Sequence, residues 1–214
     1  MIHLATPQRA FRRRAFRWVL TSVICIFAGL TFGQKPSQTS DGATILIIRH
    51  AEKPSSGHKL SALGEERAEK YIGYFKTYSI GQNAVHFDAF FAAKDSKQSH
   101  RPRLTIDPLR KSLLKSLNTD FKNENFADLV VELKGADFAG KTVLVCWHHG
   151  EIPDMLRAFG ANPKVLLPHG QWPDDVFGWL VELHLDRSGS LQSIKIINEK
   201  LMADDTTNPP ESVH

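Results

Sequence analysis

Two short apolar runs, each followed at once by a pair of polar residues, constrain the fold of this chain most strongly. The runs are residues 44–48 (TILII) and 142–147 (TVLVCW). Neither run alternates with polar residues, which is typical of strands that are buried on both faces in the middle of a parallel sheet. Ligands bind outside the carboxyl ends of the strands in such sheets. The sequence therefore predicts that the polar pairs behind the two runs meet at one functional edge.

The rest of the chain alternates helix-like and strand-like segments. Helices are predicted from apolar spacing after Ser61, which is a possible N-cap, and over 105–117, 126–135 and 152–159, the last closed by Gly160. Residues 87–92 form another apolar run, and 176–186 and 191–201 flank the turn RSGS as the arms of a hairpin. This order predicts an α/β fold, a mainly parallel sheet with helices on both faces, in a single domain with a C-terminal hairpin.

The first 33 residues resemble a targeting segment. Five arginines between Arg9 and Arg17 precede 15 uncharged residues, and this run is shorter than the roughly 20 residues that a helix needs to cross a bilayer. We expect residues 1–33 to be a signal peptide or membrane anchor, 34–42 a linker, 43–201 the domain and 202–214 a flexible tail. The protein is then exported to the periplasm or the cell exterior, and it contacts a membrane only through this segment if it stays uncleaved.

The charge balance argues against nucleic acid as a partner. The chain has 27 basic and 23 acidic residues, but five of the basic residues lie in the first 33 positions, which leaves 22 against 23. A near-neutral domain lacks the basic surface that binds nucleic acid. The two cysteines are Cys25, in the leader, and Cys146. Without the leader, Cys146 has no partner for an internal disulfide, so the stability of the domain depends on its hydrophobic core.

Four sequence blocks in order resemble one family, the histidine phosphatase superfamily, also called phosphoglycerate mutase-like. The blocks are RHAEK from Arg49, LSALGEERAE from Leu60, RPRLTIDPL from Arg101 and VLVCWHHGEIP from Val143. An Arg-His pair alone is a weak signal, whereas four ordered blocks across residues 44–160 are specific. They indicate the family but not the substrate.

The resemblance implies a phosphatase with His50 as its catalytic nucleophile. His50 would attack phosphorus in its neutral form and give a phosphohistidine that water hydrolyses. Arg49 and Arg101 would bind the phosphate oxygens, because a planar guanidinium forms two charge-assisted hydrogen bonds with them. Arg101 is preferred over Arg103 because it lies four residues before Thr105. The implied partner is a phosphorylated small molecule or a phosphoprotein, and the implied reaction needs no metal and no other cofactor.

The second catalytic histidine has two candidates. The common family pattern His-x-x-x-Ile-Pro selects His148, whereas the variant Trp-x-His-x-x-Ile-Pro selects His149. We favour His149 as catalytic because Trp147 is present, with His148 as a neighbour that binds phosphate. The general acid also has two candidates of equal rank, because Glu52 and Glu151 each follow a candidate histidine by two residues.

Two other classes of function compete with the phosphatase. A metal-dependent hydrolase would use histidines and carboxylates as ligands, namely His50, Glu52, His148, His149 and Glu151. Arg49 beside such ligands would repel a dication, and no His-Glu-x-x-His spacing is present. The other alternative is a non-catalytic member that binds a phosphorylated ligand. Substrate recognition is expected in residues 94–100 and 167–175.

Overall fold

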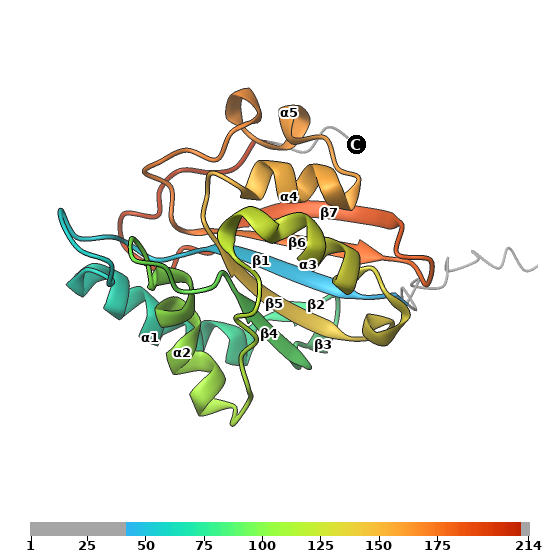
Figure 1. Ribbon diagram of the computed structural model, residues 1–214, viewed down its shortest axis with the longest axis horizontal. Helices are drawn as coiled ribbons and strands as arrows, with labels where there is room; N and C mark the ends of the chain where they lie inside the picture. Colours follow the sequence, from blue (N-terminus) through green and yellow to red (C-terminus); the bar gives the residue numbers. More distant parts are fainter. Residues whose placement is uncertain (1–41, 211–214) are drawn as a thin grey trace, which may run out of the picture. The chain divides into compact units, whose positions relative to one another are not determined.

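The computed structural model describes residues 42–210 of the chain (Figure 1). The predicted leader, all but the last residue of the predicted linker and the last four residues of the predicted tail lie outside the described residues. Among residues 42–210, no helix has the length and apolarity needed to span a membrane.

A five-stranded sheet forms the centre of the domain, in the order β4-β5-β1-β6-β7. Its strands are β1 (Thr44–Arg49), β4 (Ala89–Ala92), β5 (Thr142–Trp147), β6 (Trp179–Leu185) and β7 (Leu191–Asn198). Strand β5 pairs in parallel with both β4 and β1, and β6 pairs antiparallel with both β1 and β7. Four of the five strands therefore run in one direction. The predicted mainly parallel sheet and C-terminal hairpin are confirmed.

Helices cover both faces of this sheet, as predicted (Figure 1). They are α1 (Ala62–Thr77), α2 (Arg101–Ser112), α3 (Phe126–Leu133), α4 (Ile152–Phe159) and the single turn α5 (Pro163–Leu166). Alternate side chains of β1 explain the two layers, because Leu46 and Ile48 pack with residues of α1 and α2, whereas Ile45 and Ile47 pack with residues of α3 and α4. The two apolar faces of the strand thus fix a helical layer on each side.

Several local signals in the sequence are confirmed at the ends of these helices. The Ser61 side chain accepts a hydrogen bond from the Gly64 backbone N–H and caps α1, and Gly160 ends α4 with a φ of 100°. Helix α2 differs, because it begins at Arg101 rather than 105 and ends at Ser112 rather than 117. Proline is tolerated in a first helical turn, so Pro102 lies within the first turn of this helix and does not delay its start.

The sequence did not predict some short elements. They are the small hairpin of β2 (Ser79–Ile80) and β3 (Asn83–Ala84), and three 3₁₀ turns at Asn123–Asn125, Ala136–Phe138 and Pro168–Gly170. Each is too short to show an apolar period.

The first residues of the predicted flexible tail pack against the domain. Asp205 forms an ion pair with Arg67 of α1 at 2.8 Å, and the Thr207 carbonyl accepts a hydrogen bond from the Trp179 indole at 2.8 Å. Met202 is also buried. The domain boundary expected after residue 201 is therefore wrong, because the chain beyond β7 returns to the domain surface and pairs with it.

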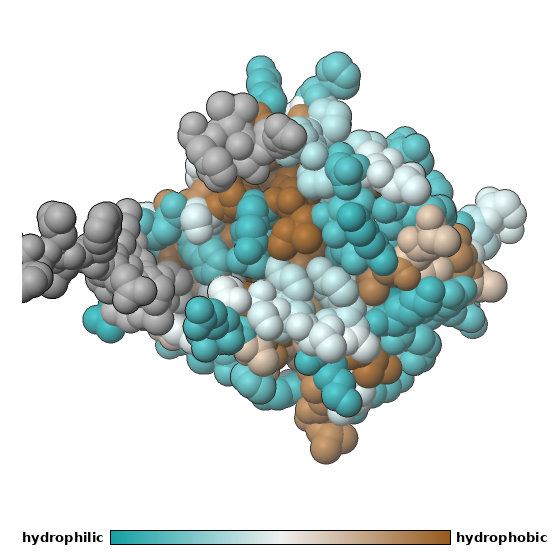
Figure 2. Space-filling model, turned by 180° about the vertical axis from the view of Figure 1, so that it is seen from behind, coloured by the Kyte–Doolittle hydropathy of each residue, from teal (hydrophilic) through white to brown (hydrophobic). Residues whose placement is uncertain are grey.

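Large apolar side chains are rarely exposed within the described part of the chain. Those that are exposed are Leu63, Leu113, Leu114, Val131 and Val165. The face seen in Figure 2 is mainly hydrophilic, with separate apolar areas between polar ones.

Candidate active site

The ends of β1 and β5 bring His50 and His148 together. Arg49 is paired with Trp147 in the parallel register, and the next backbone N–H, that of His50, donates to the Trp147 carbonyl at 2.9 Å. The ring centroids of His50 and His148 lie 5.0 Å apart in an edge-to-face arrangement. His149 is also near, with its ring centroid 6.4 Å from that of His50. The two polar pairs meet at one edge of the sheet, as the parallel strands predict.

The His50 imidazole is held in one tautomer. Its Nδ1 lies 2.7 Å from the Ala51 carbonyl oxygen, which can only accept, so Nδ1 carries the proton and Nε2 keeps a lone pair. Burial lowers the pKa of His50 to about 2; the Ala51 hydrogen bond opposes this shift, while His148 and Arg49 add to it. His50 is therefore neutral at physiological pH, as a nucleophile must be.

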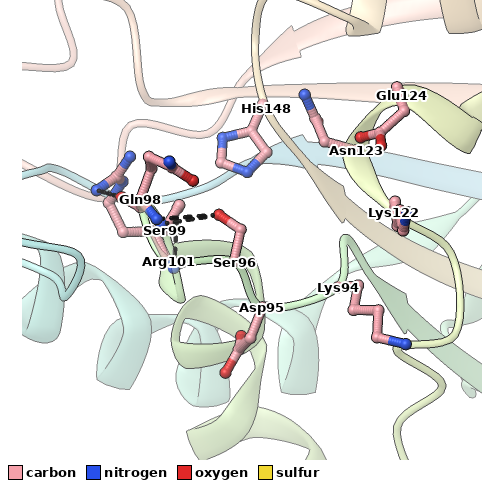
Figure 3. Close-up of a pocket in the computed structure, with 10 residues that line it drawn as sticks. All are labelled: Lys94, Asp95, Ser96, Gln98, Ser99, Arg101, Lys122, Asn123, Glu124 and His148. Carbon is pink, nitrogen blue, oxygen red and sulfur yellow. Dashed lines mark hydrogen bonds between the residues drawn. The ribbon is translucent and has the colours of Figure 1, made fainter.

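A pocket of about 630 Å³ opens beside His148 (Figure 3). This volume is in the range of sites that hold small molecules. Its walls come from the loop after β4, the first residue of α2, the segment before α3 and the residue after β5. The lining residues are Lys94, Asp95, Ser96, Gln98, Ser99, Arg101, Lys122, Asn123, Glu124 and His148. The predicted recognition segment 94–100 thus supplies one wall, whereas none of residues 167–175 lines this pocket.

Arg101, rather than Arg103, reaches the pocket. The Arg101 guanidinium makes only long hydrogen bonds of 3.4 Å to the carbonyls of Gly57 and Gln98, and its Nε is buried with no hydrogen-bond partner among the described residues. Arg103 instead forms an ion pair with Asp95 at 2.8 Å. Arg101, unlike Arg103, therefore lines the pocket and keeps donors for a ligand.

Arg49 is buried, and part of its guanidinium is hydrogen-bonded to the loop before β6. Its Nη1 donates to the carbonyls of Pro173, Asp174 and Val176 at 3.0, 3.0 and 2.8 Å, and the guanidinium carbon lies 3.8 Å from the centroid of the Phe177 ring. The Arg49 Nε is buried without a partner among residues 42–210. Burial lowers the pKa of Arg49 to about 10, so it remains a cation at neutral pH. The sequence predicted the phosphate-binding role but not this structural one.

The two neighbouring histidines differ in what their ring nitrogens contact. The Arg49 Nη2 lies 3.3 Å from His149 Nδ1, and His149 Nε2 lies 2.7 Å from an Asp174 carboxylate oxygen. Because arginine only donates, Nδ1 of His149 accepts and Nε2 donates, so both nitrogens are occupied. The His148 side chain forms no hydrogen bond with a described residue and lines the pocket. This geometry favours His148 over the preferred His149 as the second histidine.

Burial and nearby positive charges keep both neighbouring histidines neutral. Burial lowers the pKa of His148 to about 4, and Arg101 and His149 add to this shift. Burial, followed by Arg49, lowers the pKa of His149, while the Asp174 carboxylate opposes them. A bound anion would raise the pKa of His148, because it would stabilise the positively charged imidazolium.

Neither predicted general acid lines the pocket. Glu52 is buried, and its Oε1 accepts hydrogen bonds from Nε and Nη2 of Arg67 at 2.8 and 2.6 Å. Glu151 precedes α4 and is absent from the pocket wall. The carboxylates that do line the pocket are Asp95 and Glu124, which the sequence analysis did not assign. Within the described residues, no group of three or more histidine, cysteine or acidic side chains is arranged to hold a metal ion.

Comparisons with family models and with curated proteins give no match. Solved structures do match. Phosphoserine phosphatase from Entamoeba histolytica, determined with phosphoserine, aligns with 75% of this chain and 99% of its own at 12% identity and a TM-score of 0.50. The protein histidine phosphatase SixA, determined with tungstate, aligns with 71% of this chain and 96% of its own at 15% identity and a TM-score of 0.46.

A third match is phosphoglycerate mutase from Plasmodium falciparum, which aligns with 80% of this chain and 97% of its own at 16% identity and a TM-score of 0.45. Identities this low show the fold alone. The match to phosphoserine phosphatase spans nearly all of that structure. Together with the sheet and its two helical layers, it shows that this chain has the α/β fold of the histidine phosphatase superfamily, the phosphoglycerate mutase-like fold.

Proposed function

We propose that this protein is a metal-independent phosphatase that hydrolyses a phosphate monoester through a phosphohistidine on His50. The observation that carries the proposal is the state of His50. Its Nδ1 proton is donated to the Ala51 carbonyl, and burial lowers its pKa to about 2, so Nε2 offers a lone pair at any physiological pH. A fixed, neutral imidazole beside two arginines is suited to attack on a phosphoryl group.

The reaction has two displacement steps. In the first, His50 Nε2 bonds to phosphorus, the bond from phosphorus to the ester oxygen breaks, and the alcohol leaves after taking up a proton from solvent. In the second, water bonds to phosphorus and releases a proton to solvent, the phosphorus–nitrogen bond breaks, and inorganic phosphate and neutral His50 result. Covalent catalysis of this kind replaces one difficult displacement by two easier ones.

Two unpartnered donors support an anion at this position. The Nε groups of Arg49 and Arg101 are both buried and have no hydrogen-bond partner within the described part of the chain. Buried donors in proteins are nearly always satisfied, so a bound acceptor is expected. Phosphate oxygens are the acceptors that a guanidinium binds best.

The second histidine in this proposal is His148, with His149 as a positioning residue for Arg49. Replacing His148 by alanine is expected to lower kcat/KM by roughly 100-fold or more, because it removes a donor that stabilises charge in the transition state. Replacing His149 by alanine is expected to cost about ten-fold or less, since Arg49 keeps its bonds to the three loop carbonyls. Steady-state kinetics of both variants show which substitution lowers kcat/KM more. A larger loss of kcat/KM for His149→Ala would restore the sequence-based assignment.

The test of the function is hydrolysis of p-nitrophenyl phosphate by the full-length protein. This ester has a good leaving group, which suits a site where neither Glu52 nor Glu151 reaches the pocket. We expect turnover to persist in excess chelator and to be inhibited by vanadate, which adopts a five-coordinate geometry like that of the transition state. Activity lost in chelator and restored by zinc would favour a metal-dependent hydrolase instead. Vanadate binding without turnover would favour a non-catalytic phosphate-binding protein.

A further inference from the structure

We propose that the pocket selects phosphate monoesters whose leaving group carries a second anionic group, and that Lys94 and Lys122 bind this group. The inference rests on the proposed function, because it assigns the part of the substrate that leaves. The anionic group could be a carboxylate or a second phosphate, which share the chemistry that an ammonium recognises.

The two lysines form one side of the pocket although 28 positions separate them in the sequence. Lys94 follows β4, and its backbone N–H donates to the Phe121 carbonyl at 2.8 Å, which places the residue before Lys122 alongside Lys94. Both side chains line the pocket. Figure 3 shows them on the opposite side from Gln98 and Arg101, with His148 between the two sides.

The charges of the two lysines are not neutralised within the described part of the chain. Neither side chain forms a hydrogen bond or ion pair with a described residue, whereas Asp95, one of the two acidic lining residues, is paired with Arg103 at 2.8 Å. Glu124 is the other acidic lining residue, and it is exposed. Lys94 and Lys122 therefore outnumber the one unpaired carboxylate on their side, which leaves an excess of positive charge.

The position of this charge fits a leaving group rather than the transferred phosphoryl group. The phosphoryl group has its own donors in Arg49, Arg101 and His148, at the edge where His50 lies. A pocket of about 630 Å³ has room for the remainder of a small molecule beyond it. The lysine ammonium groups are flexible point charges, which suit an anion whose position varies between related substrates.

The experiment compares two substrates of one shape that differ in charge. In p-nitrophenyl phosphate the group opposite the phosphate is neutral, and in 4-carboxyphenyl phosphate it is a carboxylate. We expect the double variant Lys94→Ala/Lys122→Ala to raise KM for the carboxylate substrate about ten-fold and to leave KM for the neutral one within about two-fold. Each variant is compared with the wild type on the same substrate, so the different leaving groups do not affect the result.

Two further variants sharpen the test. Glu124→Gln removes the opposing charge and is expected to lower KM for the carboxylate substrate by about two-fold. Lys97→Ala is the matched control, because Lys97 lies in the same loop as Lys94 but does not line the pocket, and it is expected to change neither KM. The effect of the double variant should also shrink at high salt, since exposed charges are screened.

The outcomes separate this inference from the proposed function. If the wild type hydrolyses both esters and the double variant changes neither KM, or changes both equally, the lysine site is wrong and the phosphatase stands. If neither ester is hydrolysed, the proposed function fails, and calorimetric binding of 4-carboxyphenyl phosphate tests the lysines directly. Weaker binding to the double variant then supports the site, whereas equal affinity or no binding to the wild type overturns it.

Discussion

Replacement of His50 by alanine is expected to lower kcat/KM for p-nitrophenyl phosphate by at least about 1,000-fold. The imidazole is fixed by its bond to the Ala51 carbonyl and lies beside two cations that would bring the phosphoryl group to it. Positioning of this kind accounts for roughly 7–11 kcal/mol of a barrier, and the alanine variant has no group that can replace the attacking nitrogen. Steady-state assays with the full-length protein measure the loss.

Two controls separate the loss of a nucleophile from the loss of the fold. The variant should keep the circular dichroism spectrum of the wild type and should still bind inorganic phosphate, because Arg49, Arg101 and His148 remain. His86→Ala is the matched substitution, since His86 is exposed and distant in sequence from all four family-like blocks, and it should leave activity unchanged. Comparable turnover by wild type and His50→Ala would remove His50 from the mechanism.

Replacement of Arg67 by methionine is expected to lower the free energy of unfolding by about 3–5 kcal/mol. Arg67 is 1% exposed and joins Glu52, behind the candidate nucleophile, to Asp205, beyond the last strand. Burial by itself lowers the Arg67 pKa, but the hydrogen bonds with Asp205 and Glu52 outweigh it, and the net pKa lies above the ordinary value. Methionine fills a similar space and leaves both carboxylates buried without a counter-charge.

Chemical denaturation measures this change, and an exposed ion pair supplies the comparison. Arg157 pairs with Asp154 on the surface of α4, where both side chains are more than half exposed, so Arg157→Met is expected to cost at most about 1 kcal/mol. Arg67→Lys should lie between the two, because it keeps a charge but loses the paired geometry of the guanidinium. Equal, small effects of Arg67→Met and Arg157→Met would show that the buried network contributes no more to the free energy of unfolding than an exposed ion pair does.

The layout of the sheet could be predicted because its signals are local. Residues 44–48 and 142–147 are apolar on both faces, and they become adjacent parallel strands that end in register. Ser61 and Gly160 mark helix ends through their own backbone preferences. Each of these signals lies within a few residues of the structure that it predicts.

The second histidine could not be chosen from the sequence. His148 and His149 are consecutive, and successive side chains at the end of a strand point in different directions. Which of them faces the pocket depends on the loop before β6, where Asp174 holds one ring nitrogen of His149 and the loop carbonyls hold Arg49. This loop lies 25 residues further along the chain than His149, and no motif connects them.

The role of Glu52 was hidden for a similar reason. Its partner Arg67 lies 15 residues away on α1, and Arg67 in turn depends on Asp205, 138 residues further on. In the sequence, Glu52 is simply a carboxylate near His50 and is as good an acid candidate as Glu151. Only the packing of α1 against the sheet shows that Glu52 is used to neutralise a buried cation.

The central claim is a covalent phosphoryl group on His50, and rapid quench in an alkaline denaturant, with a substrate labelled in its phosphoryl group, tests it most directly. Because Nδ1 donates its proton to the Ala51 carbonyl, the account predicts an adduct at Nε2, stable in base and labile in acid, on the peptide that contains His50. The His50→Ala variant should carry no label. Active wild-type protein that gives no such adduct, or that carries the label on His148 or His149 instead, would contradict the account.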